Sequence, residues 1–218
     1  MSVRLLQHPS DAELEQIVQF SIQAYGDDPT IRSMTGNRPE LRAAFFRSML
    51  KAGTLEGQIY IVELENKDIV SVGLWFGPGM EVMKTVGQRA LGWNAFWDSL
   101  TPDTRDWWAY LNKTTDGMVD DSVGKEPLLD SWYANLIATH PSHQGKGYAS
   151  AMLRTVCERG NAEGKLVALG TQNEKNANWY RSLGFQIIGQ VEVKSDLGGF
   201  PAYLLSRKPE TTLVHGST

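Results

Sequence analysis

Apolar positions along the chain follow two periods, and each period predicts a different kind of element. Stretches rich in Ile, Val and aromatic residues, bounded by turn residues, predict strands. These stretches are Val3 to Leu6, Gln58 to Leu64, Ile69 to Phe76, Trp132 to Thr139, Leu166 to Leu169, Gln186 to Val193 and Ala202 to Ser206. The second and third are joined by a short turn and predict a hairpin.

Apolar residues three and four positions apart predict helices between these strands. The helices begin after Ser10, after Asn37 and after Gly147, and a short one covers Glu174 to Leu183. Ser10 and Glu13 form a capping-box pattern, and Asn37 is placed to cap the second helix. Gly26 to Gly36, which contains Pro29, predicts a break between the first two helices.

Composition narrows the class of protein. The chain has 218 residues, of which 41% are hydrophobic, and this is enough for one packed domain. The formal net charge of −4 argues against a nucleic-acid partner. Cys157 is the single cysteine, so no internal disulfide can form and a reducing compartment is expected. No apolar run approaches the roughly 18 residues of a membrane span, so we expect a cytoplasmic protein without membrane attachment.

The most distinctive segment lies where the strand ending at Thr139 passes into the next helix. It reads Gln144-Gly145-Lys146-Gly147-Tyr148-Ala149. Two closely spaced glycines at such a junction let backbone N–H groups turn inward together at the positive end of a helix dipole. The segment therefore predicts a pyrophosphate site with Lys146 at its rim. An ordinary glycine turn before a helix is the alternative interpretation.

Two other phosphate-binding patterns do not fit the chain. A dinucleotide-binding fold would need G-x-G-x-x-G and an acidic residue about 20 positions further on. A P-loop would need Gly-Lys followed by Ser or Thr. The segment has none of these features.

The pattern Q-x-x-G-x-A within this segment resembles the acetyl-coenzyme A signature Q/R-x-x-G-x-G/A of the GNAT N-acetyltransferases. Asn173 to Phe185 resembles the downstream element of the same family, and the predicted order of elements is also that of the family. The resemblance implies an α/β fold with a mixed, mostly antiparallel sheet and helices on both faces. Gly77 to Ser131 would then be a Trp-rich insertion before the central strand. One domain is expected over residues 1–208, followed by a flexible tail over 209–218.

The resemblance implies acetyl-CoA as co-substrate. In the family, a bulge in the strand before the glycine segment frees backbone groups for pantetheine and for polarising the thioester carbonyl, although an ordinary buried strand is the alternative here. Asn173 would cap a short helix and reach the cofactor, whereas the role of Asn176 stays open because the family often has a small residue there. The expected cofactor contacts are Leu136, Ile137, Thr139, Gln144, Gly145, Lys146, Gly147, Tyr148, Ala149, Asn173 and Asn176.

Tyr180 lies where many members of the family use a tyrosine to protonate the leaving thiolate. A tyrosine that only packs beside Trp179 is the alternative. A base is also needed, because free amines are mostly protonated at neutral pH. Asp130, Glu126 and Tyr133 are the nearest candidates in the sequence, and a water chain is equally compatible with it.

Two further groups of reactive side chains have simpler interpretations. Cys157 shares the apolar face of the helix after Ala149, which favours a core cysteine over a nucleophile. His140 and His143 have no third ligand evident in the sequence, and no metal is expected.

The segment Gly77 to Ser131 is expected to determine which acceptor is used. Helical spacing of its Trp residues favours a packed subdomain, and a substrate cage is the alternative. Acidic residues outnumber lysines between residues 112 and 131, which suits a cationic ligand, although a solvated acidic loop is equally simple. The residues expected to contact the acceptor are Trp93, Trp97, Trp107, Trp108, Asp130 and Tyr133.

These patterns together predict transfer of an acetyl group from acetyl-CoA to a primary amine by direct attack in a ternary complex. The acceptor is expected to be a small, cationic or aromatic molecule, as in the fungal and bacterial small-molecule branches that the sequence resembles. The alternatives are a CoA- or acyl-CoA-binding module with weak or lost catalysis and a protein or peptide N-acetyltransferase. The protein is expected to act as a monomer or homodimer.

Overall fold

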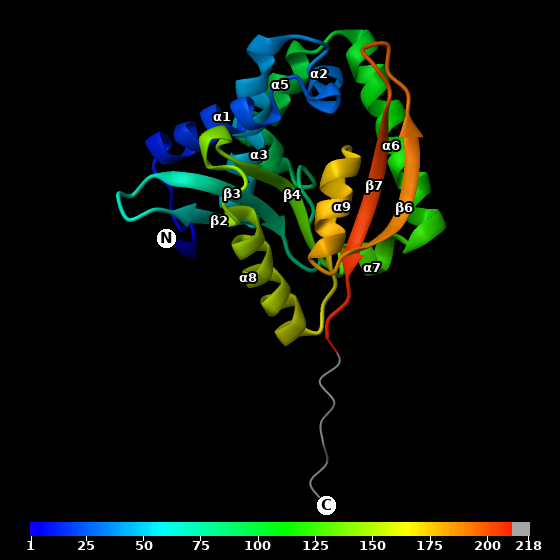
Figure 1. Cartoon of the computed structure of the whole chain (residues 1–218). Helices are drawn as coiled ribbons and strands as arrows, with labels where there is room; N and C mark the ends of the chain where they lie inside the picture. The colour runs from blue at the N-terminus through cyan, green and yellow to red at the C-terminus, as the bar shows by residue number, and fades with distance from the viewer. Residues whose placement is uncertain (211–218) are drawn as a thin grey trace, which may run out of the picture.

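The computed structural model describes residues 1–210, which form one seven-stranded sheet with helices on both faces (Figure 1). The strands lie in the order β1-β2-β3-β4-β5-β7-β6. Only β4 and β5 are parallel; the other neighbours are antiparallel. The strands are β1 (Ser2–Leu5), β2 (Gln58–Glu63), β3 (Ile69–Phe76), β4 (Trp132–Thr139), β5 (Val167–Thr171), β6 (Gln186–Val193) and β7 (Phe200–Arg207). The predicted fold class is therefore confirmed.

The helices follow the predicted order, with additional ones in the insertion. They are α1 (Asp11–Tyr25), α2 (Pro29–Met34), α3 (Arg42–Glu56), α4 (Val86–Gln88), α5 (Asn94–Ser99), α6 (Pro102–Ser122), α7 (Lys125–Leu129), α8 (Tyr148–Glu163) and α9 (Glu174–Ser182), with short helical turns at Pro39–Leu41, Arg89–Trp93 and Pro141–His143. No helix within residues 1–210 is long and apolar enough to cross a lipid bilayer. Of the tail expected at 209–218, residues 211–218 lie outside the described part of the chain.

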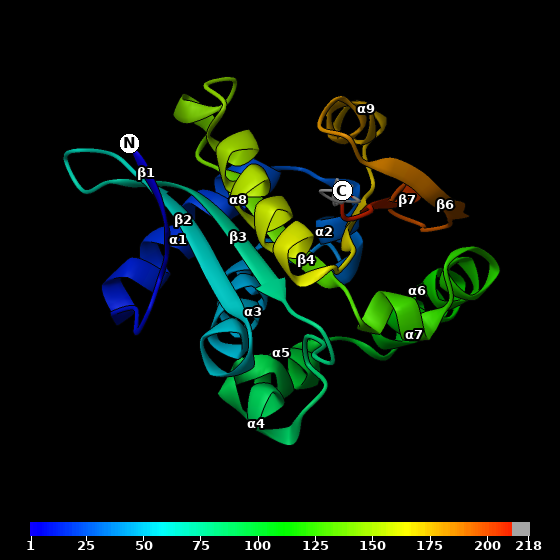
Figure 2. The same ribbon diagram turned by 90° about the horizontal axis from the view of Figure 1, so that it is seen from below.

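Each face of the sheet has its own hydrophobic core. Figure 2 shows α8 crossing one face, with α1 and α3 on the other. Ile17 of α1 and Phe46 of α3 are almost fully buried on their side. Met152 and Val156 of α8 are equally buried on the opposite side, against Trp75 of β3. Burial of this apolar area on both faces is the main stabilising contribution to the fold.

The capping box before α1 is confirmed, because the Glu13 amide donates to Ser10 Oγ and the Ser10 amide donates to the Glu13 carboxylate. The predicted break over Gly26 to Gly36 is wrong in part, since it contains the short helix α2. Asp28 caps α2 and Pro29 occupies its first turn, a favourable pair for starting a helix. Asn37 does not cap the next helix; its φ is 57° and the helical turn begins after Arg38.

A β-bulge divides β4 between the two cores. Leu74 of β3 pairs with Leu136, whereas Trp75 pairs with Ala134, so Asn135 is the extra residue on β4. Trp132 and Ala134 belong to the core under α8, but Leu136 and Ala138 belong to the core under α1 and α3. In a regular strand, side chains two residues apart lie on the same face. The bulge therefore turns the second half of β4 over and separates it from β5.

The insertion between β3 and β4 packs on α3 and along the edge strand β6. Gln88 is fully buried and donates hydrogen bonds to Glu56 of α3 and to the Glu81 carbonyl. The rings of Trp93 and Trp97 lie 6.1 Å apart and both contact the ring of Trp108. In Figure 1, α6 runs beside β6 and β7. The insertion is thus a packed unit whose first half faces α3 and whose second half covers the sheet edge.

Candidate active site

The glycine segment before α8 has the conformation of an anion site. Gly145 and Gly147 have φ values of 75° and 80°, and a Cβ at either position would meet no atom within 4 Å. Gly147 is the N-cap of α8, and no described side chain caps this helix. Its first N–H groups therefore point toward open space, where an anion can accept hydrogen bonds from them. The exposed Lys146 adds a cation at the rim.

A cavity of about 380 Å³ lies between β4 and β5. The two strands pair only from Trp132 to Ala134 of β4, so they separate beyond the bulge. The residues of the predicted cofactor set that line this cleft are Leu136, Ile137, Thr139, Gln144, Asn173 and Asn176. The Gln144 side chain donates to the Thr139 carbonyl at 3.2 Å. The chain continues from Gln144 through Gly145 and Gly147 into the first turn of α8, which contains Tyr148 and Ala149.

Asn173 and Asn176 lie together at the start of α9. The Asn173 side chain accepts a hydrogen bond from the Asn176 amide at 3.3 Å, as expected for an N-cap. Both side chains are exposed and line the cleft. Their position leaves the Asn176 side chain available to a ligand in the cleft.

Tyr180 lies in the wall of the cleft, with only 6% of its surface exposed. Its ring packs against Trp179 and Phe185, with centroids at 4.6 and 5.9 Å. Burial, and then the neighbouring Tyr25, raise the pKa of Tyr180 above its usual value of 10.0. The phenol therefore keeps its proton at neutral pH and can donate a hydrogen bond into the cleft.

A second, larger cavity of about 640 Å³ adjoins the cleft. Its walls come mainly from α2, α3, the insertion and β4. Trp93, Trp97, Trp108 and Tyr133, all predicted to contact the acceptor, line it. The residues that line both cavities are Tyr25, Asp28, Ala134, Asn135, Leu136, Gly170 and Gln172. The two cavities thus meet at the β4 bulge.

Two residues of this shared wall, Tyr25 and Asp28, were not predicted from the sequence. The Tyr25 hydroxyl donates to the Ile137 carbonyl at 3.4 Å. Burial, and then the charge of Asp28, raise the pKa of Tyr25 to about 12. Both residues come from the end of α1 and the following turn, which the sequence marks only as a break. The Asp-Pro pair in that turn is the one local signal that could have indicated a structured position.

Trp107 and Asp130 do not belong to the acceptor site. The Trp107 indole donates to the Lys194 carbonyl at 2.9 Å, and its ring contacts Phe200. Asp130 forms an ion pair with Lys165 at 2.7 Å, before the start of β4. Neither residue lines either cavity. The structure therefore does not bring these two residues together with Trp93, Trp97, Trp108 and Tyr133, because Trp107 packs toward β7 and Asp130 pairs with Lys165.

The acidic part of the insertion also does not form a wall of the acceptor cavity. Lys125 lies 3.6 Å from the carboxylates of Asp116 and Asp120. Asp121 borders a separate surface groove between α6 and β6. Among residues 1–210, Asp28 is the single carboxylate that lines the larger cavity, and Arg89 is its single cation. The acidic residues between 112 and 131, which suited a cationic ligand in the sequence, therefore lie outside this cavity.

None of the three base candidates from the sequence is placed to accept a proton. Glu126 and Asp130 lie outside both cavities. Tyr133 lines the acceptor cavity, but burial raises its pKa to about 12, so the phenol holds its own proton at neutral pH. His140 and His143 flank the glycine turn, where His140 Nδ1 accepts from the Ser142 amide. Within residues 1–210, no cluster of three or more His, Cys, Asp or Glu side chains is arranged to hold a metal ion.

Cys157→Ala is expected to leave acetyl transfer unchanged. Cys157 is buried on the sheet-facing side of α8, outside both cavities, and burial raises the pKa of its thiol. The smaller side chain should lower the free energy of unfolding by about 1 kcal/mol through lost packing. Thiol-release assays and thermal unfolding of the variant test both expectations. An acetylated Cys157 trapped in the wild type would contradict direct transfer.

Comparisons with known proteins agree with this architecture. Residues 103–187 match the family model described as an acetyltransferase (GNAT) domain. An uncharacterized N-acetyltransferase of Schizosaccharomyces pombe is 24% identical over 207 residues, which cover 87% of this chain and 77% of the relative. The matched segment includes β4, the glycine turn, α8, β5 and the whole of α9.

Solved structures share the fold. The structure of histone acetyltransferase HPA2 and related acetyltransferase from Corynebacterium glutamicum has a TM-score of 0.65 and 22% identity, with 98% of this chain and 100% of that chain covered. A Salmonella typhimurium acetyltransferase, solved with its cofactor acetyl-CoA, has a TM-score of 0.53 and 14% identity, with 96% and 94% covered. The fold is therefore that of GNAT acetyltransferases. Residues 103–187 match the acetyltransferase domain of that family, and the similarities support an N-acetyltransferase.

Proposed function

We propose that the enzyme transfers the acetyl group of acetyl-CoA directly to the primary amine of a small molecule in the larger cavity. The observation that carries this proposal is the common wall of the two cavities at Ala134, Asn135 and Leu136. A cofactor that enters from the glycine turn and an acceptor that enters from the insertion would meet there. Holding both reactants in one site favours direct attack, because it removes the entropic cost of bringing them together.

The pyrophosphate of acetyl-CoA would bind to the amides from Gly145 to Ala149, and pantetheine would lie along the second half of β4. The bulge at Asn135 leaves backbone groups of β4 without a partner on β5, so one N–H can polarise the thioester carbonyl. The amine then attacks the carbonyl carbon, a C–N bond forms and the C–S bond breaks. Tyr180 donates to the sulfur that leaves.

The aromatic lining of the larger cavity favours an acceptor with an aromatic or apolar body and an amino group. A volume of about 640 Å³ lies within the range of small-molecule sites. The face of a Trp ring attracts a cation as well as apolar groups. This preference comes from the rings, since the acidic stretch of α6 lies elsewhere. One side of the cavity is lined by α5, by the helical turn before it and by Val82 and Met83, which disfavours an extended peptide.

Thiol release measured across a panel of polyamines, arylamines, aminoglycosides, amino acids and peptides tests the proposal. Arylamines and aralkylamines are expected to be the best acceptors. Trp97→Ala should raise the KM for such an amine about fivefold or more, with the KM for acetyl-CoA little changed, because a ring of the acceptor cavity is lost. Trp107→Ala is the matched control: it removes the same side chain from the same insertion outside the cavity, and should change neither constant beyond twofold.

Two outcomes of this panel would favour the other interpretations. Tight binding of acetyl-CoA with no amine-dependent thiol release would indicate a CoA-binding module. Release with peptides only would indicate a protein N-acetyltransferase. Both outcomes would contradict the small-molecule proposal.

A further inference from the structure

The wall shared by the two cavities carries one carboxylate, and we propose that Asp28 binds the acceptor nitrogen and accepts its proton. The inference rests on the proposed function, since it assigns the group that receives the amine in that reaction. Asp28 lines both the cofactor cleft and the acceptor cavity. No other Asp or Glu of residues 1–210 lines either of them.

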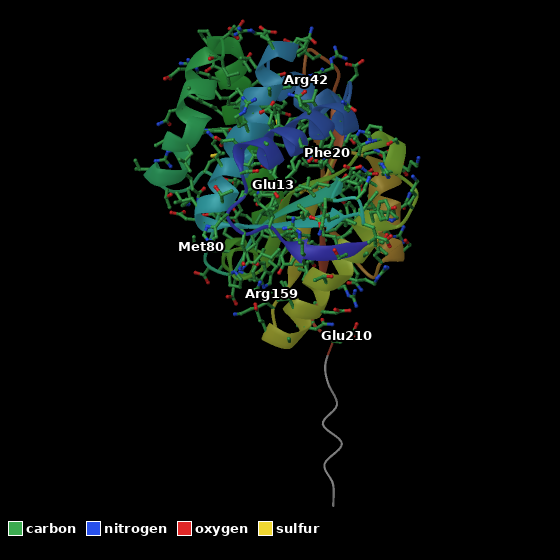
Figure 3. The ribbon with its side chains drawn as sticks, turned by 90° about the vertical axis from the view of Figure 1, so that its left-hand side faces the viewer. Glu13, Phe20, Arg42, Met80, Arg159 and Glu210 are labelled. Carbon is green, nitrogen blue, oxygen red and sulfur yellow. The ribbon has the colours of Figure 1, made fainter. Side chains whose placement is uncertain are left out.

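The turn that carries Asp28 is held in place from both sides. Asp28 Oδ1 accepts hydrogen bonds from the Thr30 and Ile31 amides at 2.9 and 3.1 Å. Arg42, the first residue of α3 (labelled in Figure 3), donates to the Gly26 carbonyl at 2.7 Å. The α2 cap uses only Oδ1, so Oδ2 is left for a ligand. A carboxylate oxygen fixed in this way needs little reorganisation to bind a cation.

Asn135, at the bulge, lines the same two cavities as Asp28. Its side-chain Oδ1 is buried and has no hydrogen-bond donor among residues 1–210, so this oxygen is not exposed to either cavity. The charged acceptor in this wall is therefore the Asp28 carboxylate. An ammonium group carries three N–H donors and a positive charge, so it suits this carboxylate better than a neutral alcohol or thiol does.

The protons balance if Asp28 takes the first of them. The ammonium gives one proton to the Asp28 carboxylate, which releases it to solvent. The neutral nitrogen attacks the thioester carbon, and the electron pair of the broken C–S bond leaves with the sulfur. Tyr180 gives its proton to the thiolate. The nitrogen then loses its second proton, which restores the Tyr180 hydroxyl. The products are the acetamide, CoA as the free thiol and one released proton.

The groups that face Asp28 in these walls do not compete for this role near neutral pH. Tyr25 of α1, Tyr133 of β4 and Tyr180 of α9 are phenols whose pKa values burial raises, so they stay protonated. Arg89 is the cation that the insertion contributes to the acceptor cavity. The pH dependence near neutrality should therefore report on the amine and on the group that takes its proton.

The test compares Asp28→Asn with its neighbour Asp27→Asn, using the best amine of the panel between about pH 6 and 10. Asn caps a helix as well as Asp, so Asp28→Asn keeps the start of α2 while the charge is lost. We expect kcat/KM to fall about tenfold or more near pH 7. The difference in kcat/KM between the wild type and the variant should become smaller as the pH approaches the pKa of the amine, because a free amine needs no proton acceptor. Asp27, whose side chain is 93% exposed outside both cavities, should give wild-type values.

Binding of the same amine to the CoA-loaded enzyme, measured by calorimetry, separates this inference from the proposed function. Weaker binding to Asp28→Asn than to the wild type supports the amine site even if turnover is absent and the proposed function fails. Equal binding overturns the inference even if acetyl transfer occurs. An equal loss of kcat/KM at every pH, together with a lower melting temperature, would also overturn it, because that result indicates a structural role.

Discussion

Tyr180→Phe is expected to lower kcat for acetyl transfer about a hundredfold or more, with the KM for acetyl-CoA nearly unchanged. The substitution removes one hydroxyl and little volume. Tyr180 lines the cleft between β4 and β5, and burial and Tyr25 raise the pKa of its hydroxyl with no hydrogen bond contributing. The donor is therefore available for the thiolate that forms as the C–S bond breaks. Steady-state thiol release with a saturating amine measures the effect.

The control for this variant is Tyr203→Phe. Tyr203 is buried on β7 in the same core and lies outside both cavities. It should keep wild-type turnover. Because the raised pKa of Tyr180 keeps the phenol neutral, wild-type kcat should not decline through its ionisation between about pH 7 and 9. If the Tyr180→Phe enzyme keeps the wild-type kcat, Tyr180 is a packing residue beside Trp179 and not the proton donor.

Gly147→Asp is expected to weaken acetyl-CoA binding more than tenfold, which corresponds to about 1.4 kcal/mol. Gly147 is the N-cap of α8 with a φ of 80°, and a side chain there would occupy the open space in front of the helix N-terminus. A carboxylate in that space would occupy the anion site and repel the pyrophosphate. Titration calorimetry with acetyl-CoA measures the change.

Gly164→Asp is the matched control, because Gly164 ends the same helix with a φ of 66° and equally open surroundings. Both substitutions put the same residue into the left-handed region, so the backbone cost is similar. Asp is also a favourable N-cap, which should preserve the fold of Gly147→Asp. Equal acetyl-CoA affinities of the two variants would contradict the pyrophosphate assignment.

Much of the site could be read from local patterns. The two glycines before α8 predicted a close backbone turn at the helix start, and both have positive φ values in the structure. The Asn173 cap of α9 followed from its position before a short amphipathic helix. These features depend on residues that are neighbours in the sequence, so a single chain carries enough information to predict them.

The acceptor site could not be assembled in this way, because its residues come from α1, α3, the insertion and β4. Four Trp residues of similar local character divide into three that line the cavity and one, Trp107, that points to β7. Helical spacing does not specify which neighbour an insertion packs against. For the same reason, the acidic residues of α6 suggested an electrostatic wall that the packing of α6 on β6 turns away.

By itself, the sequence determined the order of the strands, the main helices outside the insertion and the glycine turn before α8. Local periodicity, capping and glycine conformations are encoded within a few residues, which is why these predictions held. The tertiary structure alone decided the bulge at Asn135, which moves Leu136 and Ala138 to the opposite face from Ala134 although all three share one parity. The tertiary structure also places Asp28 beside the two cavities that Ala134 and Leu136 line. Pairing between β3 and β4 and the packing of α1 on the sheet set these positions, and both join segments far apart in the chain.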